Sequence, residues 1–375
     1  MNLVAIRMLL GDGAKYLALV SGLAFATFLM LNQGGIFFGL MDRSGAAISN
    51  VPEVDVWVIH PKTPQYDQRH PIFDVALQRV RGVPGVAWAV PRYVSGASAR
   101  FPDGSFCGIS VVGVDRATGV GLPHTFETGD PSQLNDPDAV FWDNMSLDIY
   151  RRVLKTGDVF EINDRRARVA GIVTPPLSFS GTPTVYTTIE RAQSYSPPGR
   201  DGLSYVLVKV QDGADPDDVA KAISDTTGLE AIRSRDFAQR TKDFYMFEGG
   251  IAFNFGFTVL LGAIVGVAVS AQTFYTFVLE NAKNFATLKA MGLGRRALVQ
   301  MVLLQATFVG LVGWGLGAGC AALFGWDIGP RTLMAFQLSH ALLWCSLIAM
   351  VLTSLFAAVI AIYRVLKIEP ALVFR

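Results

Sequence analysis

Three features of the sequence have residue types that could bind a ligand or a metal ion. A glycine-rich run, GWGLGAG at 313–319, could cradle a phosphate group. An aspartate-rich run, DGADPDD at 212–218, could coordinate a cation through its carboxylates. Histidine, a common metal ligand, occurs at four positions: His60, His70, His124 and His340. Each feature also has a purely structural explanation.

The structural explanations account better for all three features. The glycine run lies inside a long apolar segment and follows no soluble strand, so we expect no nucleotide loop there. The aspartate run lacks the bidentate glutamate of an EF-hand, and a solvated helix cap explains it better. The histidines have no metal-ligand spacing, and Cys107 is expected to be a small buried residue rather than a nucleophile. We therefore expect no metal site.

Catalytic motifs are also missing from the sequence. It contains no G-x-x-x-x-G-K-[ST] phosphate loop, no G-x-S-x-G elbow and no H-E-x-x-H zinc motif. The formal net charge is only +1. We therefore expect a non-catalytic chain that binds no cofactor itself and has no nucleic-acid partner.

The apolar residues are concentrated in four runs, each longer than the ~20 residues needed to cross a bilayer. The runs are 17–40, 250–279, 298–325 and 339–362. None of them contains lysine or arginine. The first run is expected to be a retained span rather than a signal peptide, because its apolar core is too long and no A-x-A-like site follows it. The sequence thus predicts a membrane protein with four transmembrane helices.

Charge near the ends of the spans predicts the orientation. Three basic segments fall on the same side by the parity of crossing: the N-terminal segment 1–16, the connection 280–297 and the tail 363–375. We assign that side to the cytoplasm, so both termini are cytoplasmic. The domain 41–248, with 22 basic and 27 acidic residues, then lies outside together with a short loop at 326–338.

The outside domain contains two β-α-β patterns. Alternating, β-rich segments predict strands at 53–60, 86–94, 203–210 and 229–233. Helices are predicted at 72–81 and at 215–227, and Pro91 suggests an edge strand or a bulge. This pattern is typical of a ferredoxin-like split β-α-β arrangement. The expected fold class is an α-helical membrane protein with a large extracytoplasmic α+β domain.

A different pattern occupies about 100–195, between the two halves of this domain. Turn residues are frequent there, and short strands such as 106–114 and 167–173 alternate with them. One helix is expected near 143–152. We predict an inserted, mostly β subdomain.

Small and polar residues in the spans suggest how the helices pack. Paired glycines at spacing i, i+4 allow close helix approach in lipid, and they are Gly262 with Gly266, Gly313 with Gly317, and Gly315 with Gly319. These pairs could pack inside the bundle or form a dimer face. The other polar residues are few, mainly Ser270, Gln272, Gln305, Thr353 and Ser354. The spans therefore offer no polar pathway, and they suit a protein whose transmembrane helices move together as a rigid body.

The connection at 284–296, NFATLKAMGLGRR, predicts a short helix with a defined apolar stripe. Phe285, Leu288 and Met291 recur every three residues, and Gly292 follows them. A mere connector needs no such stripe, so the pattern favours a docking surface. The alternative is a basic loop that only sets the topology.

Several phrases of the chain together resemble the permeases of MacB/FtsX-type ABC transporters, most closely their DevC-like branch. The most specific is NFATLKAMGLGRRALVQMVLLQA, and the terminal IEPALVFR supports it. In the outside domain, VVGVDRATGVG and LKTGDVFEINDRRARVAGIV are similar to the family's domain. The order of one span, a large outside domain and three closing spans also matches.

The resemblance implies a dimer of permeases in a bacterial inner membrane, driven by two separate ATPase subunits that bind ATP and Mg²⁺. It further implies a periplasmic adaptor of the membrane-fusion class, a TolC-like outer-membrane duct, and export driven by mechanotransmission rather than by a channel through the spans. The 284–292 helix would be the coupling helix. The residues expected to couple to the ATPase are Glu280, Phe285, Leu288, Lys289, Met291, Gly292, Arg295 and Arg296.

Three rival functions share parts of this pattern. A lipoprotein-releasing permease of the Lol type has similar topology and size. An FtsX-like activator of a cell-wall hydrolase has the same four spans, but its outside domain is generally smaller. A membrane-anchored sensor or enzyme without an ATPase is disfavoured by the coupling phrase.

Overall fold

The computed structural model describes residues 2–11, 13–144, 154–175, 179, 181–197, 202–332 and 335–367. The chain forms two compact units. The helical unit consists of residues 1–39, 251–330 and 334–375, and the α/β unit consists of residues 40–250 and 331–333. The boundaries 41–248 expected for the outside domain fall within two residues of this division.

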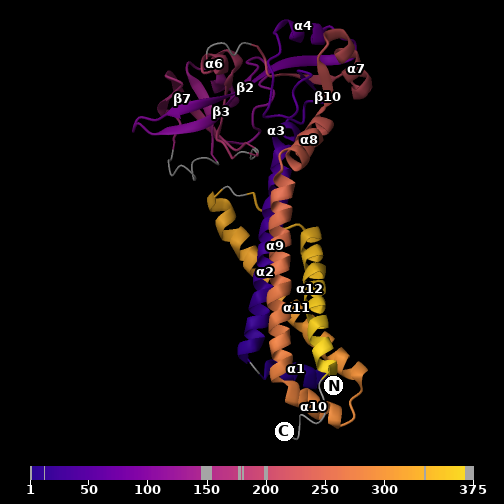
Figure 1. The fold of residues 1–375 in the computed structure, drawn as a ribbon. Coiled ribbons are helices and arrows are strands. Elements are labelled where there is room, and N and C mark those ends of the chain that lie inside the picture. The colour runs from indigo at the N-terminus through magenta and orange to yellow at the C-terminus, as the bar shows by residue number, and fades with distance from the viewer. Residues whose placement is uncertain are drawn as a thin grey trace. The chain divides into compact units, whose positions relative to one another are not determined.

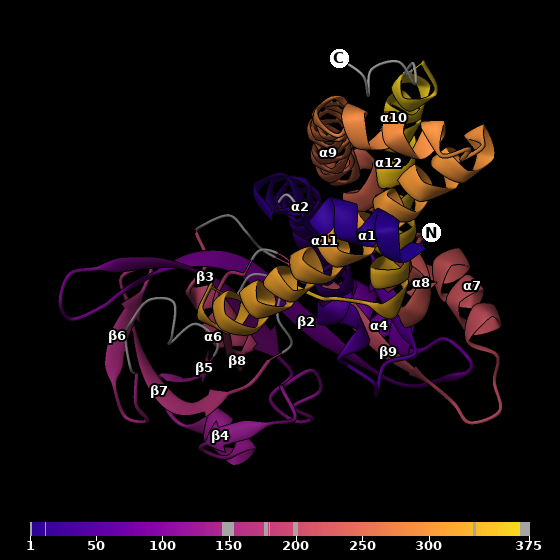
Figure 2. The same ribbon diagram turned by 90° about the horizontal axis from the view of Figure 1, so that it is seen from below.

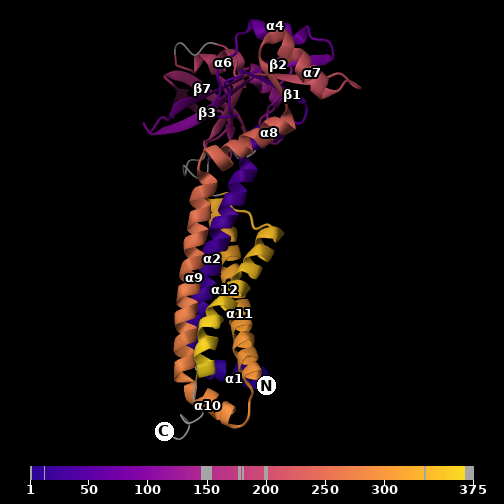
Figure 3. The ribbon, with the colours of Figure 1, turned by 45° about the vertical axis from the view of Figure 1, so that its right-hand side comes forward.

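Four long helices lie side by side in the helical unit (Figures 1 and 3). They are α2 (Gly13–Ser44), α9 (Ile251–Glu280), α11 (Arg295–Thr332) and α12 (His340–Lys367). Each contains a stretch long and apolar enough to span a membrane, as predicted. Two short helices, α1 (Asn2–Leu10) and α10 (Ala282–Ala290), lie together at one end of this bundle.

The bundle is held together by packing and by a few hydrogen bonds between helices. Its buried core draws on α1, α2, α9, α10, α11 and α12. Ser354 Oγ on α12 donates to the Ala306 carbonyl on α11 at 2.6 Å, and Trp314 Nε1 donates to Ser346 Oγ at 3.0 Å. Such contacts matter because lipid tails are as apolar as the helix surfaces. The hydrophobic effect therefore does not drive helices together inside a membrane, and packing and hydrogen bonds do so instead.

Two expectations for the helical unit need correction. The segment 1–16 was expected only as a cytoplasmic extension, but it contains α1, and Leu9 is fully buried in the bundle core. The range 326–338 was expected as a loop, but α11 continues through Thr332. After it, Gln337 N donates to the Gly35 carbonyl at 2.9 Å, so the following segment packs against α2. The terminal IEPALVFR, 368–375, lies outside the described residues.

One half of the α/β unit has the predicted ferredoxin-like topology. Its strands are β1 (Val56–Ile59), β9 (Tyr205–Val210), β10 (Glu230–Arg233) and the first half of β2 (Val86–Arg100). They are antiparallel in the order β10-β1-β9-β2. The two crossing helices, α4 (Val75–Arg81) and α7 (Pro216–Thr227), lie beside each other (Figure 1).

Both faces of this sheet are covered, which explains the buried strand β1. Val56 and Val58 belong to a core cluster that includes residues of α4 and α7. Trp57 and Ile59 point the opposite way, into a cluster with Phe237 of helix α8 (Ser234–Asp243). Successive side chains of a strand alternate between faces, so all four residues are buried.

The other half is a closed ring of six strands (Figure 2). The path β2-β3-β8-β5-β7 closes because β6 pairs with both β7 and β2. The remaining strands and short helices of this half are β3 (Phe106–Val114), β4 (Phe126–Thr128), β5 (Ala139–Asp143), β6 (Val159–Ile162), β7 (Arg165–Val173), β8 (Thr184–Thr188), the 3-10 turn η1 (Pro131–Asn135) and α6 (Ile189–Ser194). Closure removes exposed sheet edges. Most of the helix expected near 143–152 lies outside the described residues.

Strand β2 belongs to both halves. Residues up to Arg92 pair only with β9, and pairing with β3 begins at Tyr93. Pro91 therefore lies where β2 is the edge of the ferredoxin-like sheet, and the register shifts between Val86 and Trp88. Of the two alternatives suggested by Pro91, the edge position is present at this residue, because proline cannot donate to a second neighbour, while the register shift lies earlier in the strand.

The chain enters and leaves the α/β unit through segments that contact each other. Entry is through Gly45 and the short helix α3 (Ala46–Ser49), and exit is through α8 and a π-helical turn, η2 (Phe244–Glu248). A Cβ atom on Gly45 would lie 2.9 Å from Lys242 Cε and 3.3 Å from Ala238 Cβ. Glycine thus permits the close approach of the entry segment to α8.

Candidate functional site

The corner between α9 and α10 is built around Asn281. Its backbone N–H and its side-chain amide both donate to the Phe277 carbonyl at 3.0 Å, which closes the last turn of α9. Its own carbonyl accepts from Phe285 N at 3.0 Å, which begins α10. Asparagine suits this corner because its short polar side chain satisfies backbone groups that a helix end leaves open.

The inner face of α10 is buried in the bundle. Phe285 is only 1% exposed and Ala286 is fully buried. Phe285 belongs to a core cluster with Leu9 of α1, Phe277 of α9 and Leu298 of α11. The expectation that the Phe285 side chain enters a groove on a partner is therefore wrong, because the chain's own helices already surround it.

The end of α10 is a Schellman motif, which fixes the direction of the following turn. Gly292 has φ +92°, and its N–H donates to the Lys289 carbonyl at 3.2 Å. Leu293 N donates to the Leu288 carbonyl at 3.1 Å. Leu288 and Leu293 are both half-buried against the bundle core, the apolar contact that accompanies this motif. Leu288 thus faces inward rather than toward solvent.

The outer face of α10 and the turn after it are polar and basic. Met291 is 68% exposed, and Glu280 lies exposed at the end of α9. Arg295 and Arg296 form the exposed start of α11, while Lys289 is half-buried. Further exposed positions of α10 are Lys283, Asn284, Thr287 and Ala290. The structure therefore divides the predicted coupling residues between an anchored inner face and an open outer face.

The glycine pairs of the spans are divided in the same way. A Cβ atom on Gly313 would lie 2.7 Å from Leu23 Cβ, and one on Gly317 would lie 2.6 Å from Thr27 Cβ, both on α2. On α9, a Cβ atom on Gly266 would lie 2.8 Å from Ala26 Cβ, also on α2. Gly262 makes looser contact, with Leu29 of α2 at 3.7 Å. These four glycines pack against one central helix.

Gly315 and Gly319 lie on a different face of α11. A Cβ atom at either position would meet no heavy atom of the described residues within 4 Å. Both glycines are exposed, as are Leu316 and Leu323 nearby. This face is the part of the glycine pattern that the chain itself does not cover.

The α/β unit gives structural roles to the other candidate residues. Among the described residues, no three histidine, cysteine, aspartate or glutamate side chains gather to hold a metal ion. Cys107 is buried, and Asp215 caps α7 by accepting from Asp217 N at 2.9 Å. His60 and His70 stack with ring centroids 5.3 Å apart. Partial burial, together with the charges of His70 and Lys62, lowers the pKa of His60.

Comparison with known proteins agrees with this architecture. Residues 17–226 match the family model of the MacB-like periplasmic core domain, and residues 256–370 match that of the FtsX-like permease C-terminal region. The chain is 26% identical over 310 residues to an uncharacterized ABC transporter permease of Mycobacterium tuberculosis, covering 81% of this chain and 79% of the relative. It is 25% identical over 370 residues to another of Mycobacterium bovis, covering 96% and 94%.

Two solved structures are similar to the α/β unit. The periplasmic region of MacB from Actinobacillus actinomycetemcomitans matches with a TM-score of 0.38 and 13% identity, covering 52% of this chain and 96% of that one. The extracellular domain of the transporter YknZ from Gram-positive bacteria matches with a TM-score of 0.35 and 13% identity, covering 48% and 98%.

Proposed function

Because the chain belongs to the family of MacB-like and FtsX-like ABC transporter permeases, we propose that it is the membrane subunit of an exporter driven by a separate ATPase. In this proposal, α10 docks on the ATPase at the cytoplasmic face. Movement passes through the helical unit to the α/β unit, which expels substrate on the outer side through an adaptor and a TolC-like duct. ATP and Mg²⁺ belong to the partner chain.

The observation that carries the proposal is the division of α10 into two faces. Its inner face is locked into the core by Phe285 and Ala286, and its outer face is open. A helix held only by its ends would tilt when a partner pushed on it. A helix whose apolar side chain is embedded among α1, α9 and α11 passes the displacement on to all of them, since packed interiors have low compressibility.

The two arginines after α10 support a docking role. Arg295 and Arg296 occupy the first turn of α11, where the helix dipole is positive. A cation there is unfavourable by roughly 0.3–1 kcal/mol at an exposed site. Helix stability therefore does not account for these residues, whereas an acidic ATPase surface or anionic lipid headgroups would. Basic residues here also fit a cytoplasmic position of the turn.

The wider assembly follows from the same proposal. Both termini lie in the cytoplasm, the membrane is the bacterial inner membrane, and two copies of the chain sit on two ATPase subunits. The uncovered glycines Gly315 and Gly319 give a second copy a surface for close approach. The scarcity of buried polar residues in the spans supports a mechanism that moves the helices as bodies and does not pass cargo between them.

A charge reversal on the outer face tests the proposal. The double variant Arg295→Glu with Arg296→Glu should reduce co-purification of the cognate ATPase by roughly tenfold to a hundredfold, since removal of an interface hot spot costs about 2 kcal/mol or more. The midpoint of thermal unfolding (Tm) should not fall, because both side chains are exposed. A matched control, Lys221→Glu with Arg235→Glu, makes the same change in charge on exposed positions of the α/β unit.

Recovery of the ATPase should be normal in the matched control. Normal recovery and normal transport with the Arg295→Glu and Arg296→Glu variant would contradict the docking role. The co-purified proteins also separate the rival functions: an adaptor supports export, and a peptidase with coiled coils supports activation of a wall hydrolase.

A further inference from the structure

A buried arginine in the α/β unit has no carboxylate partner among the residues that the structure describes. Arg92 on β2 is 3% exposed, and its guanidinium carbon lies 5.8 Å from the centre of the Trp57 ring. Its Nη1 donates to the Gly121 carbonyl at 3.3 Å. Its Nε has no hydrogen-bond partner, and no ion pair joins it to a carboxylate within the described part of the chain. A buried charge of this kind is costly unless something pairs with it.

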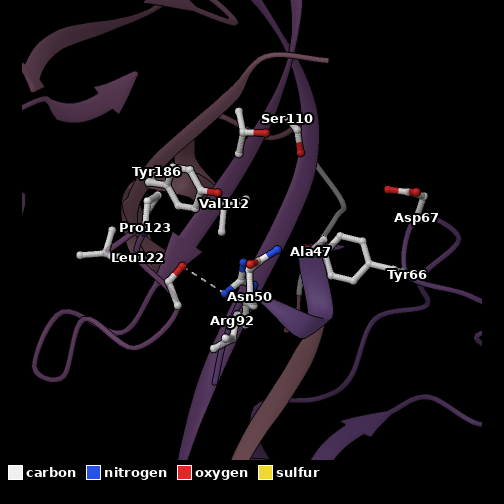
Figure 4. Close-up of a pocket in the computed structure, with 13 residues that line it drawn as sticks. Ala47, Asn50, Tyr66, Asp67, Arg92, Ser110, Val112, Leu122, Pro123 and Tyr186 are labelled. Carbon is white, nitrogen blue, oxygen red and sulfur yellow. Dashed lines mark hydrogen bonds between the residues drawn. The ribbon is translucent and has the colours of Figure 1, made fainter. Parts of the chain in front are cut away.

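Arg92 lines a small pocket (Figure 4). The walls come from β2, β3, β8, the end of α3, and the loops before β4 and after β1. The cavity has a volume of about 60 Å³, room for a few water molecules at roughly 15 Å³ each. This is the size of a single small polar group and far below the roughly 300–1,000 Å³ of a drug-sized site.

Hydroxyl groups line the same cavity as the guanidinium. Tyr186 on β8 is 5% exposed, and burial raises the pKa of its phenol well above the ordinary value, so the hydroxyl stays protonated and can donate. Ser110 on β3 and Thr184 on β8 add two more hydroxyls. The structure records no hydrogen bond for the Tyr186 or Ser110 hydroxyl within the described residues, so these groups are open to a ligand.

We propose that this pocket binds one oxyanion group, a carboxylate or a phosphate of a small molecule, between Arg92 and the Tyr186 hydroxyl. The planar guanidinium fork matches two oxygens of either group, which gives a charge-assisted, bidentate contact. One acidic residue, Asp67, also lines the pocket. Its carboxylate accepts from the Tyr245 hydroxyl at 2.6 Å and lies beyond Tyr66 in Figure 4, so it is engaged elsewhere.

The pocket lies where different parts of the α/β unit meet, so a bound group would contact more than one of them. Arg92 lies where β2 passes from the ferredoxin-like sheet to the six-stranded ring, while Tyr186 belongs to the ring alone. Asn50, at the end of α3, forms part of the rim. A bound oxyanion would hold these three parts of the α/β unit together. The inference does not depend on docking of an ATPase.

The test is anion-dependent thermal stability of the full-length protein in nanodiscs. Chloride is replaced by inorganic phosphate or by acetate at constant ionic strength, and Tm is measured. A ligand that binds only the folded state raises Tm in a saturable way. Tyr186→Phe keeps the ring and should leave Tm without oxyanion near that of the wild type, but weaken the affinity about tenfold, which corresponds to about 1.4 kcal/mol. Arg92→Lys keeps a charge without the fork and should weaken it further.

A matched tyrosine provides the control. The Tyr195 hydroxyl donates to the Arg166 carbonyl at 3.1 Å, outside the pocket, so Tyr195→Phe should lower Tm and leave the response to anions unchanged. Saturable stabilisation by phosphate alone or by acetate alone identifies the group, and stabilisation by both supports the shared oxyanion chemistry. No saturable rise with either anion, or an equal response in Tyr186→Phe, overturns the proposal. That variant decides the question even if Arg92→Lys does not fold.

Discussion

Apolar and small residues of the helical unit occur at both inward-facing and outward-facing positions, and their roles differ between the two. On α10 and the turn after it, Phe285 is 1% exposed and Met291 is 68% exposed. On α11, Gly317 touches Thr27 of α2, whereas Gly319 has open space around it. In both cases similar residues recur at a regular spacing in the sequence, but other helices of the chain pack against only some of them.

The difference shows what a periodic pattern specifies. A spacing of three or four residues indicates that a helix has an apolar or a small-residue face. It does not specify whether the chain itself, lipid or another protein covers that face. The inward positions should therefore control stability, and the outward positions should control association. Three predictions test this contrast.

The largest effect is expected at Phe285. Phe285→Ala should destabilise the protein by about 3–5 kcal/mol, the usual cost of truncating a buried aromatic residue. Phe285→Glu should cost more, because it places an unpaired carboxylate in an apolar core. Recovery of the full-length protein from the membrane, and Tm in detergent, measure the loss.

A neighbouring exposed position on the same helix is the control for Phe285. Thr287→Glu introduces the same carboxylate at an exposed site of α10, so its Tm should stay close to that of the wild type. Wild-type recovery and Tm in Phe285→Glu, accompanied by loss of a bound ATPase, would reverse the assignment and make Phe285 a docking residue.

The second prediction compares two glycines on α11. Gly317→Val should lower the unfolding free energy by about 1–3 kcal/mol, because its Cβ would overlap the Ala24 carbonyl and Thr27 and push α11 away from α2. Gly319→Val should change it by less than about 0.5 kcal/mol, since no atom of the described residues lies within 4 Å of the added Cβ. Thermal unfolding of the two variants in the same detergent gives the comparison.

The oligomeric state of Gly319→Val sharpens this result. A lower fraction of dimer, with Tm unchanged, would show that a second copy covers the Gly315 and Gly319 face. Equal loss of stability in Gly317→Val and Gly319→Val would contradict the division between inner and outer glycines.

Most of the fold could be predicted from the sequence, because its signals are local. The four spans follow from apolar length, and the two β-α-β patterns follow from alternation and caps such as Asp215 with Pro216. The closed ring could not be predicted, since it depends on β6 pairing not only with β7, its neighbour in sequence, but also with β2, which lies far from it in sequence. The helix α1 was missed because its apolar residues lie beyond the end of the long span, although Leu9 is buried.

The candidate site could be predicted only in part. The segment 284–296 was identified from its stripe, but the burial of Phe285 depends on α1, α9 and α11 meeting around it. Arg92 gave a weak signal, a charged residue within the β-rich segment 86–94. Its importance comes from contacts with Gly121 and Trp57, which lie far from it in sequence. Neither arrangement has a local sequence pattern.

The smallest expected effect is at Gly292, in the Schellman turn that ends α10. With φ +92°, it has a backbone conformation that residues with a Cβ rarely adopt, so Gly292→Ala should cost about 1–2 kcal/mol. The strain should loosen the hydrogen bond from Leu293 N to the Leu288 carbonyl, which sets the direction of the chain toward Arg295. Gly294→Ala is the matched control, because Gly294 has no positive φ and no atom in the described part of the chain lies within 4 Å of the added Cβ.

Two measurements separate stability from orientation in these variants. If the Schellman turn holds the outer face in place for a partner, Gly292→Ala should lower Tm slightly and also lower ATPase recovery, although no exposed side chain has changed. Gly294→Ala should leave both values near those of the wild type. A fall in Tm with full ATPase recovery in Gly292→Ala would show that the partner recognises only the basic side chains. The fixed direction of the Schellman turn would then play no part in coupling.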